Sequence, residues 1–173
     1  TPNTLLYNKS FALFGIDKAK SAIRESGNCI LVEGNLDVVM SHQAGVRNAV
    51  ATCGTAFSHD HSRILKRYTD RLLLAFDADA AGDSALKKSI GTAMASGLAV
   101  SVVSIPFGKD TADAVKENTE LWKESASKPV PYNGYLISRS MESFLGTLDS
   151  KKAVLANVLP FIKIISSPLD RDF

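Results

Sequence analysis

Six carboxylates stand just after apolar segments that the sequence predicts as strands. They are Glu33, Asp37, Asp77, Asp79, Asp110 and Asp113. Because the carboxyl ends of parallel strands meet at one edge of a sheet, we expect these side chains to converge there. Carboxylates at such short distances from one another raise each other's pKa values unless a cation lies among them. An all-oxygen donor set favours Mg²⁺ or Mn²⁺ over zinc or copper, so the sequence predicts a divalent-cation site at this edge.

Other site chemistries have weaker support. The chain contains no G-x-x-x-x-G-K-[ST], G-x-S-x-G or G-x-G-x-x-G motif. His59 and His61 flank Asp60 in an H-x-H pattern that could bind zinc, but they fall in the first turn of a predicted helix, where we expect solvent exposure. Lys87 and Lys88 are predicted to lie on a solvated helix face, although their place after the acidic loop would let them meet a phosphate.

An alternation of strands and helices has to position the acidic residues. Short apolar runs predict buried strands at 29–32, 48–52, 72–76 and 98–105. Helical spacing and capping residues predict helices at 16–25, 36–44, 59–68, 81–96, 111–117 and 119–126. This order is typical of an α/β fold in which a parallel four-stranded sheet has crossover helices on its faces.

The pattern changes after a linker at 127–131 that carries two prolines. Beyond it the sequence predicts only helices, at 133–145 and 151–165, and Pro160 should kink or split the second of them. We therefore expect three parts: a lead-in segment with the first helix at 1–27, an α/β domain at 28–127, and a helical subdomain at 128–173.

Composition sets broad limits on the function. The 173 residues are 45% hydrophobic and 22% charged, which is typical of a globular domain with a real core. A net charge of +2 gives no indication of a nucleic-acid partner. The apolar runs are too short to cross a bilayer. Cys29 and Cys53 show neither zinc-ligand spacing nor a C-x-x-C pattern, so we expect reduced thiols and a cytoplasmic protein.

Several segments resemble a known family. Residues 33–38 (E-G-N-L-D-V) resemble the E-G-x-x-D-V motif of Toprim domains, and residues 77–82 (D-A-D-A-A-G) resemble their D-x-D-x-x-G motif. Further segments are similar, in the same order, to parts of bacterial replicative primases: 13–16 (L-F-G-I), 54–56 (G-T-A) followed by His61, 106–110 (P-F-G-K-D) and 162–173. The resemblance covers essentially the whole chain.

This resemblance implies a fold and a function. It implies a Toprim-like α/β domain with a helical subdomain, from the catalytic core of a DNA primase. Such a nucleotidyltransferase makes short RNA primers from NTPs on single-stranded DNA, with Mg²⁺ or Mn²⁺. It further implies a monomer that meets the replicative helicase through a C-terminal domain outside this chain, and a zinc-binding domain and a polymerase subdomain before it. The activity of this segment alone is not implied.

The resemblance also implies roles for individual residues. Glu33, Asp77 and Asp79 match the catalytic metal ligands, and Asp110 matches a further metal-site acid. Asp37 would not bind the metal itself but would hold the metal ligands in position.

One position departs from the family pattern, in which a second acid follows two places after Asp110. Ala112 stands there, so either Asp113 substitutes for that acid or one metal site is weakened. Lys9, and less closely Lys20, match basic residues that would meet nucleotide phosphates.

Three other classes of protein remain open from the sequence. Another Toprim phosphotransfer enzyme, such as a topoisomerase or an OLD-type nuclease, would share the acidic motifs. A Toprim module that binds nucleic acid without catalysis would not need the full acidic set. A phosphatase or receiver domain would use Asp77 as a phosphoryl acceptor but would not need Glu33 at a second strand end.

Overall fold

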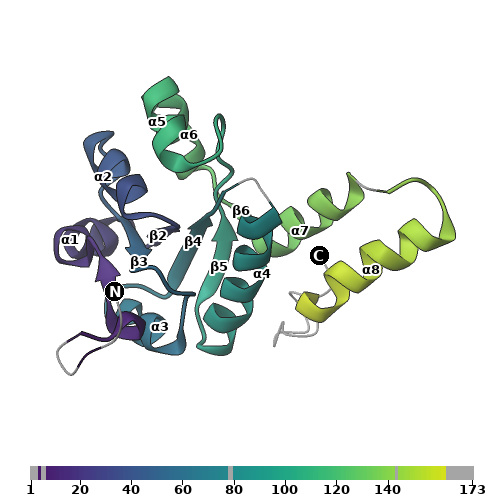
Figure 1. Ribbon diagram of the computed structural model, residues 1–173, viewed down its shortest axis with the longest axis horizontal. Coiled ribbons are helices and arrows are strands. Elements are labelled where there is room, and N and C mark those ends of the chain that lie inside the picture. Colours follow the sequence, from purple (N-terminus) through teal and green to yellow (C-terminus); the bar gives the residue numbers. More distant parts are fainter. Residues whose placement is uncertain (1–3, 5–6, 78–79, 143, 163–173) are drawn as a thin grey trace. The chain divides into compact units, whose positions relative to one another are not determined.

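The chain divides into two compact units, with the boundary in the sequence between Pro129 and Val130. Four parallel strands form the centre of the first unit. The computed structural model in Figure 1 describes residues 4, 7–77, 80–142 and 144–162. The parallel strands are β2 (Cys29–Val32), β3 (Ala49–Thr52), β4 (Arg71–Ala75) and β5 (Ala99–Val102). The predicted α/β class with a parallel four-stranded sheet is confirmed.

The strand order within this unit is β1-β3-β2-β4-β5. The chain goes from β2 outward to β3 and then returns to β4 on the other side of β2, where Val32 pairs with Ala75. The order therefore reverses between β2 and β4. In open parallel sheets the crevice at such a reversal, beyond the carboxyl ends of the strands, is the usual ligand site.

A short edge strand was not predicted. β1 (Leu13–Phe14) pairs antiparallel with β3, with Leu13 opposite Thr52. It follows a single turn of 3₁₀ helix, η1 (Lys9–Phe11), in the lead-in segment before the first helix. Two residues carry no detectable period, so this strand is defined by its partner rather than by its own sequence.

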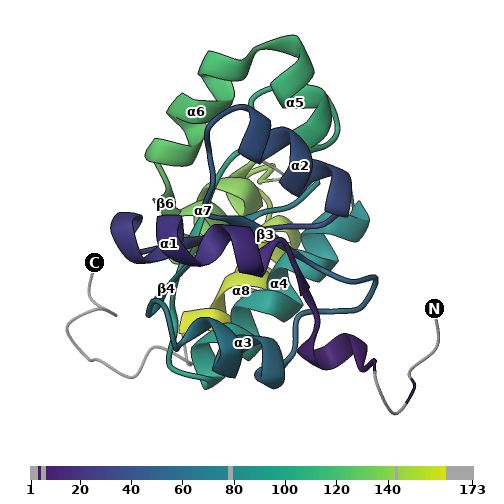
Figure 2. The ribbon, with the colours of Figure 1, turned by 90° about the vertical axis from the view of Figure 1, so that its left-hand side faces the viewer.

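Helices cover both faces of the sheet (Figure 2). They are α1 (Ile16–Ser26), α2 (Asn35–Gln43), α3 (His59–Leu65), α4 (Ala80–Ala95), α5 (Thr111–Glu117) and α6 (Thr119–Ser127). α2, α5 and α6 lie on one side of the sheet, and α3 and α4 lie on the other. All six agree with the predicted helices to within about three residues. Coverage of both faces explains why β2, β3 and β4 are almost continuously apolar instead of alternating.

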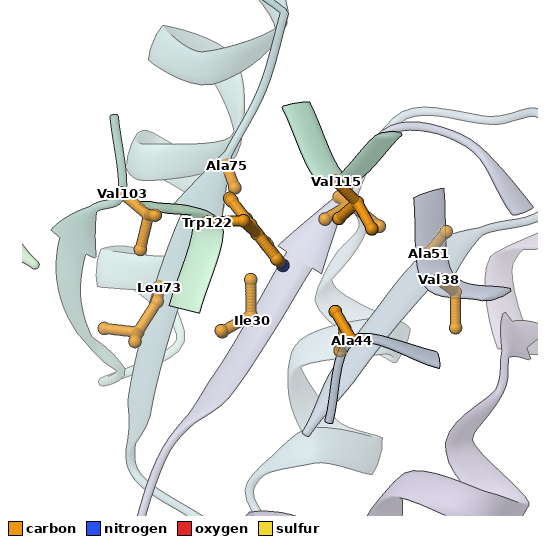
Figure 3. Close-up of a cluster of buried hydrophobic side chains, with 11 residues drawn as sticks. Ile30, Val38, Ala44, Ala51, Leu73, Ala75, Val103, Val115 and Trp122 are labelled. Carbon is orange, nitrogen blue, oxygen red and sulfur yellow. The ribbon is translucent and has the colours of Figure 1, made fainter. Parts of the chain in front are cut away.

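The core under α2, α5 and α6 is built around the only tryptophan of the chain, Trp122, which is fully buried (Figure 3). Ile30 and Leu73 approach it from the sheet, and Val115 packs beside it from α5. Alternate residues of the same strands, among them Leu31 and Leu72, are buried toward the opposite face, as the two-residue period of a strand requires.

The second unit contains β6 (Val130–Pro131), α7 (Tyr132–Met141) and α8 (Leu148–Ile162). α7 packs against α8, and the Tyr132 hydroxyl donates to the Phe161 carbonyl over 3.4 Å. The predicted helices are confirmed, but their ends differ. α7 ends four residues early, before Gly146 at φ +74°. α8 starts three residues early, because the Thr147 side chain accepts from the Ser150 amide, and it is not split at Pro160.

Candidate active site at the strand ends

Glu33 and Asp77 meet at the point where the strand order reverses. Glu33 directly follows β2, and Asp77 stands two residues after β4. The Glu33 Oε1 atom accepts a hydrogen bond from the Asp77 amide over 3.0 Å. This bond joins the ends of two neighbouring strands, so the two carboxylates belong to one small region of the sheet edge. Asp79, the third predicted ligand, lies outside the described residues.

Gly82 lets the first turn of α4 sit directly on this pair. A Cβ atom at this position would collide with the Asp77 carbonyl and would lie 3.0 Å from Glu33 Oε1. Because no backbone can yield at so short a contact, only glycine fits. The glycine of the D-x-D-x-x-G pattern therefore has a steric reason: α4 has to start against the acidic pair.

The buried side chain of Asp37 connects the turn after β2 to the start of α5. Its Oδ2 atom accepts from the Gly34 amide and its Oδ1 atom accepts from the Ala112 amide, both over 2.9 Å. The side chain is buried, and burial raises its pKa. The two backbone bonds oppose the rise, and the negative charges of Asp110 and Asp113 add to it. With both oxygens held by amides, Asp37 braces the turn after Glu33 against the start of α5.

Asp110 and Asp113 belong to the start of α5. Asp110 is the N-cap residue, and its Oδ1 atom accepts from the Asp113 amide over 2.8 Å. The Asp113 carboxylate is partly exposed and lies 3.8 Å from the Lys116 ammonium. The amide of Ala112, which stands between the two acids, donates to Asp37, so the start of α5 lies close to the turn after Glu33.

The described residues contain no group of three or more His, Cys, Asp or Glu side chains arranged to hold a metal ion. Asp79 is not among these residues. The donors that are placed are carboxylate oxygens, which is the chemistry that Mg²⁺ and Mn²⁺ prefer. The donor types therefore fit a hard divalent cation, while the convergence of all six acids stays a prediction.

A pocket of about 130 Å³ opens beside Glu33. The loop after β3 forms part of its wall with Gly54, Thr55, Ala56 and Phe57. Lys88 and Ser89 of α4 also line it. Lys88 thus provides a positive charge in the same pocket as the Glu33 carboxylate, a suitable pair for a ligand that carries both phosphate and metal.

The two lysines at 87 and 88, expected together on a solvated face, differ in the structure. The Lys87 ammonium lies 2.9 Å from the Asp83 carboxylate one turn earlier, whereas Lys88 lines the pocket. The sequence indicated only that this pair follows the acidic loop. Which of the two reaches the pocket depends on the rotation of α4, and the tight contact at Gly82 helps to set that rotation.

Lys9 reaches the rim of the pocket from η1. Its ammonium donates to the Gly54 carbonyl over 3.5 Å. The Asn8 side chain accepts from the Ser10 amide and holds the turn on which Lys9 stands. Lys20, the other predicted phosphate ligand, is exposed on α1. It is not among the described residues that line the pocket.

The sequence predicts a solvent-exposed His61, and this prediction is wrong. His61 is fully buried, and burial lowers its pKa. It stacks against Phe57 with ring centroids 5.8 Å apart. His59 is exposed as expected and meets the Ser96 hydroxyl. The two histidines face different surroundings because neighbouring positions on a helix do not share a face, so the pair makes no H-x-H metal site.

Comparison with known proteins agrees with this arrangement. Residues 30–115 match the family model described as Toprim-like. The chain is 31% identical over 176 residues to a DNA primase of Clostridium acetobutylicum, covering 99% of this chain and 29% of that protein. It is 32% identical over 173 residues to one of Deinococcus radiodurans, covering 98% and 30%. The chain therefore spans about 30% of the length of these relatives.

Solved structures give the same result. The RNA polymerase domain of Mycobacterium tuberculosis primase matches with a TM-score of 0.83 and 31% identity, over 99% of this chain and 57% of that one. The zinc-binding and RNA polymerase domains of Aquifex aeolicus primase match with a TM-score of 0.83 and 28% identity, over 99% and 41%. A primase catalytic domain bound to single-stranded DNA matches with a TM-score of 0.78 and 27% identity, over 99% and 57%.

Proposed function

Because this chain belongs to the Toprim family of bacterial DNA primases, we propose that it is the catalytic part of a primase that makes short RNA primers from NTPs on single-stranded DNA. Residues 28–127 are the Toprim catalytic domain in this proposal, and residues 128–173 are a helical subdomain. The observation that carries it is the bond between Glu33 and the Asp77 amide at the reversal of strand order. Two motif acids are thereby joined where α/β sheets bind ligands.

The reaction joins a primer 3′-hydroxyl to the α-phosphate of an incoming NTP, and pyrophosphate leaves. Its transition state concentrates negative charge, so catalysis consists mostly of positioning and charge neutralisation. Glu33, Asp77 and Asp79 would hold Mg²⁺ or Mn²⁺, which supplies that neutralisation when bound. Asp110 and Asp113 would add oxygen donors from the start of α5.

The remaining residues have supporting roles. Asp37 accepts hydrogen bonds from two backbone amides and thereby holds the turn after Glu33 and the start of α5 at a fixed spacing. Lys88, in the pocket wall, and Lys9, at the rim, would bind the triphosphate. Lys20, exposed on α1, would also meet nucleotide phosphates.

Partners and surroundings follow from the same proposal. Single-stranded DNA is the template, as it is the ligand in one of the matching structures. The replicative helicase would bind a part of the longer protein outside this chain, and the cytoplasm would be the site of action. Among the described residues, no helix is both long and apolar enough to cross a membrane.

Primer synthesis is favoured over the other Toprim activities by the extent of the similarity, which continues beyond the Toprim-like segment over 98–99% of the chain. A topoisomerase or an OLD-type nuclease would share the acidic motifs without these flanking segments.

The test is NTP incorporation on single-stranded DNA with Mg²⁺ or Mn²⁺, in a polypeptide that carries this chain at the full length of its relatives. We expect Asp77→Ala to lower incorporation about 100-fold or more, since removing a metal ligand costs several kcal/mol of transition-state stabilisation. Asp70→Ala is the matched control, because Asp70 is exposed just before β4, at its other end. Equal activity of the Asp77→Ala variant and the wild type would refute the proposal.

A further inference from the structure

His61 is a fully buried titratable group to which the proposed mechanism assigns no part. Its surroundings define its hydrogen-bonding state. The Ser58 amide donates to Nδ1 over 3.2 Å, so Nδ1 has to carry a lone pair. Nε2 therefore carries the hydrogen and donates it to the Lys9 carbonyl over 2.9 Å. The imidazole is neutral and joins α3 to η1 across 52 residues of sequence.

Two other contacts hold η1 on α3. The Ser58 hydroxyl donates to the Ser10 carbonyl over 3.1 Å. The Arg63 guanidinium lies over the Phe11 ring, 5.8 Å from its centroid. With the His61 bond included, each of the three residues of η1 has its own contact with α3 or with its N-cap residue, Ser58. A single turn of 3₁₀ helix has too few internal bonds to hold its own position, so these contacts determine where it lies.

The position of η1 matters because of the side chain that it carries. The Lys9 ammonium reaches the Gly54 carbonyl at the rim of the pocket, and Phe57, which stacks on His61, lines that pocket. His61 thus supports both the backbone of Lys9 and one wall of the pocket. A shift of about 1 Å in a group that binds substrate is enough to cost a large part of its effect.

We propose that His61 is a positioning residue for substrate binding, which places the Lys9 ammonium at the pocket by holding the Lys9 carbonyl. This inference rests on the proposed function for the identity of the ligand, an NTP triphosphate. The contact by which His61 holds η1 is independent of that function, and it can be measured without an activity assay.

A histidine that only caps α3 would give a different result, and two amide variants separate the two roles. In His61→Asn, the side-chain oxygen takes the place of Nδ1 and can still accept from the Ser58 amide, but the side chain no longer reaches Lys9. In His61→Gln, the side-chain amide takes the place of Nε2 and can still donate to the Lys9 carbonyl. A capping role favours Asn, and a positioning role favours Gln.

The first measurement is hydrogen exchange of the Phe11 and Ala12 amides, which donate to the Asn8 and Lys9 carbonyls inside the turn. In the 173-residue chain, we expect at least tenfold faster exchange in His61→Asn and a nearly wild-type rate in His61→Gln. Exchange of the strand amides of β2 and β4 reports whether each variant is folded. Equal exchange of η1 in both variants would overturn the proposal.

The second measurement is the KM for NTP in the full-length polypeptide. We expect His61→Asn to raise this KM about tenfold with little change in kcat, which is the loss of about one charge-assisted contact, and His61→Gln to restore it. In a Lys9→Met background, His61→Asn should raise KM no further. An additional rise in that background would show that His61 acts by another route and would overturn the proposal. If the wild type incorporates no nucleotide, the proposed function fails, while the exchange comparison still decides whether His61 holds η1.

Discussion

The acidic residues at the sheet edge have different structural duties, although they share one chemistry. Glu33 accepts from the amide of Asp77, Asp37 accepts from two amides, and Asp110 caps α5. A carboxylate that is committed to backbone amides is fixed in orientation, which lets its neighbours hold a cation with little further loss of side-chain freedom. The motif spacing alone cannot distinguish ligand from brace.

The replacement of the family's second acid by Ala112 can be tested at Asp110 and Asp113. Asp110→Asn keeps the cap on α5, since asparagine is as good an N-cap as aspartate, but removes the charge. We expect it to weaken Mn²⁺ binding in the full-length polypeptide by about tenfold, as loss of one ligand charge would. If Asp113 substitutes for the missing acid, Asp113→Ala weakens binding similarly. Unchanged Mn²⁺ titrations would remove either residue from the metal site.

The burial of His61 predicts a dependence of stability on pH. Burial lowers its pKa from the usual 6.5, while the carbonyls of Lys9 and Ala12 and the charge of Asp60 oppose the shift. Below pH 6.5 the unfolded chain therefore binds a proton that the folded chain does not, and the free energy of unfolding falls as the pH falls. Urea unfolding at pH 7.5 and 5.5 should show a larger loss for the wild type than for His61→Gln. Equal losses would contradict this prediction.

At the scale of elements, the helices are aligned by contacts at their first turns. α4 starts against the Asp77 carbonyl, α5 starts against Asp37, and α3 holds η1 with the residues at its own start. Helix starts carry unpaired amides, which acidic side chains and loops satisfy. The acidic candidate residues therefore lie at helix starts as well as at strand ends.

Gly82 and Gly91 provide a matched pair on α4. A Cβ at Gly82 would collide with Asp77, whereas a Cβ at Gly91 would meet nothing within 4 Å. We expect Gly82→Ala to lower NTP incorporation at least tenfold, because it pushes α4 away from the acidic pair. Gly91→Ala should leave incorporation unchanged and stabilise the chain by about 0.5–1 kcal/mol, since alanine favours helix. A fully active Gly82→Ala variant would contradict the steric role.

At the scale of the whole molecule, the chain divides into two compact units. The cluster around Trp122 is made entirely of residues that precede the boundary at Pro129. Because Trp122 is the only tryptophan, its fluorescence reports the first unit alone. We expect residues 1–129 to unfold cooperatively in urea, with the emission maximum and midpoint of the 173-residue chain. A truncated chain with an exposed tryptophan would show that the first unit depends on the second.

The elements themselves were largely predictable, because apolar period and capping residues act over a few neighbours. The start of α3 at His59 follows from Ser58, whose side chain accepts from the His61 amide. The end of α7 was harder to predict, since residues 144 and 145 are as apolar as a helix would need, and Gly146 with its left-handed backbone stands beyond them. The edge strand β1 had too few residues to show a period.

The candidate site was predictable in kind but not in arrangement. The residue types and their places after strands are local facts, so Glu33, Asp77 and Asp110 could be singled out from the sequence. The burial of His61, the reach of Lys9 to Gly54 and the position of Lys88 in the pocket depend on segments that are distant in sequence. No local pattern encodes such contacts, and for that reason the sequence wrongly predicts that His61 is exposed to solvent.

By itself the sequence determined an α/β chain with carboxylates after the ends of its strands, because hydrophobic period and side-chain chemistry are properties of short segments. Tertiary structure alone decided that the strand order reverses between β2 and β4 and that Glu33 bonds to the end of β4. It also decided which polar side chains brace and which face the pocket. The physical reason is that hydrogen bonds and close packing between distant segments exist only after the chain has folded and brought them within a few ångströms of one another.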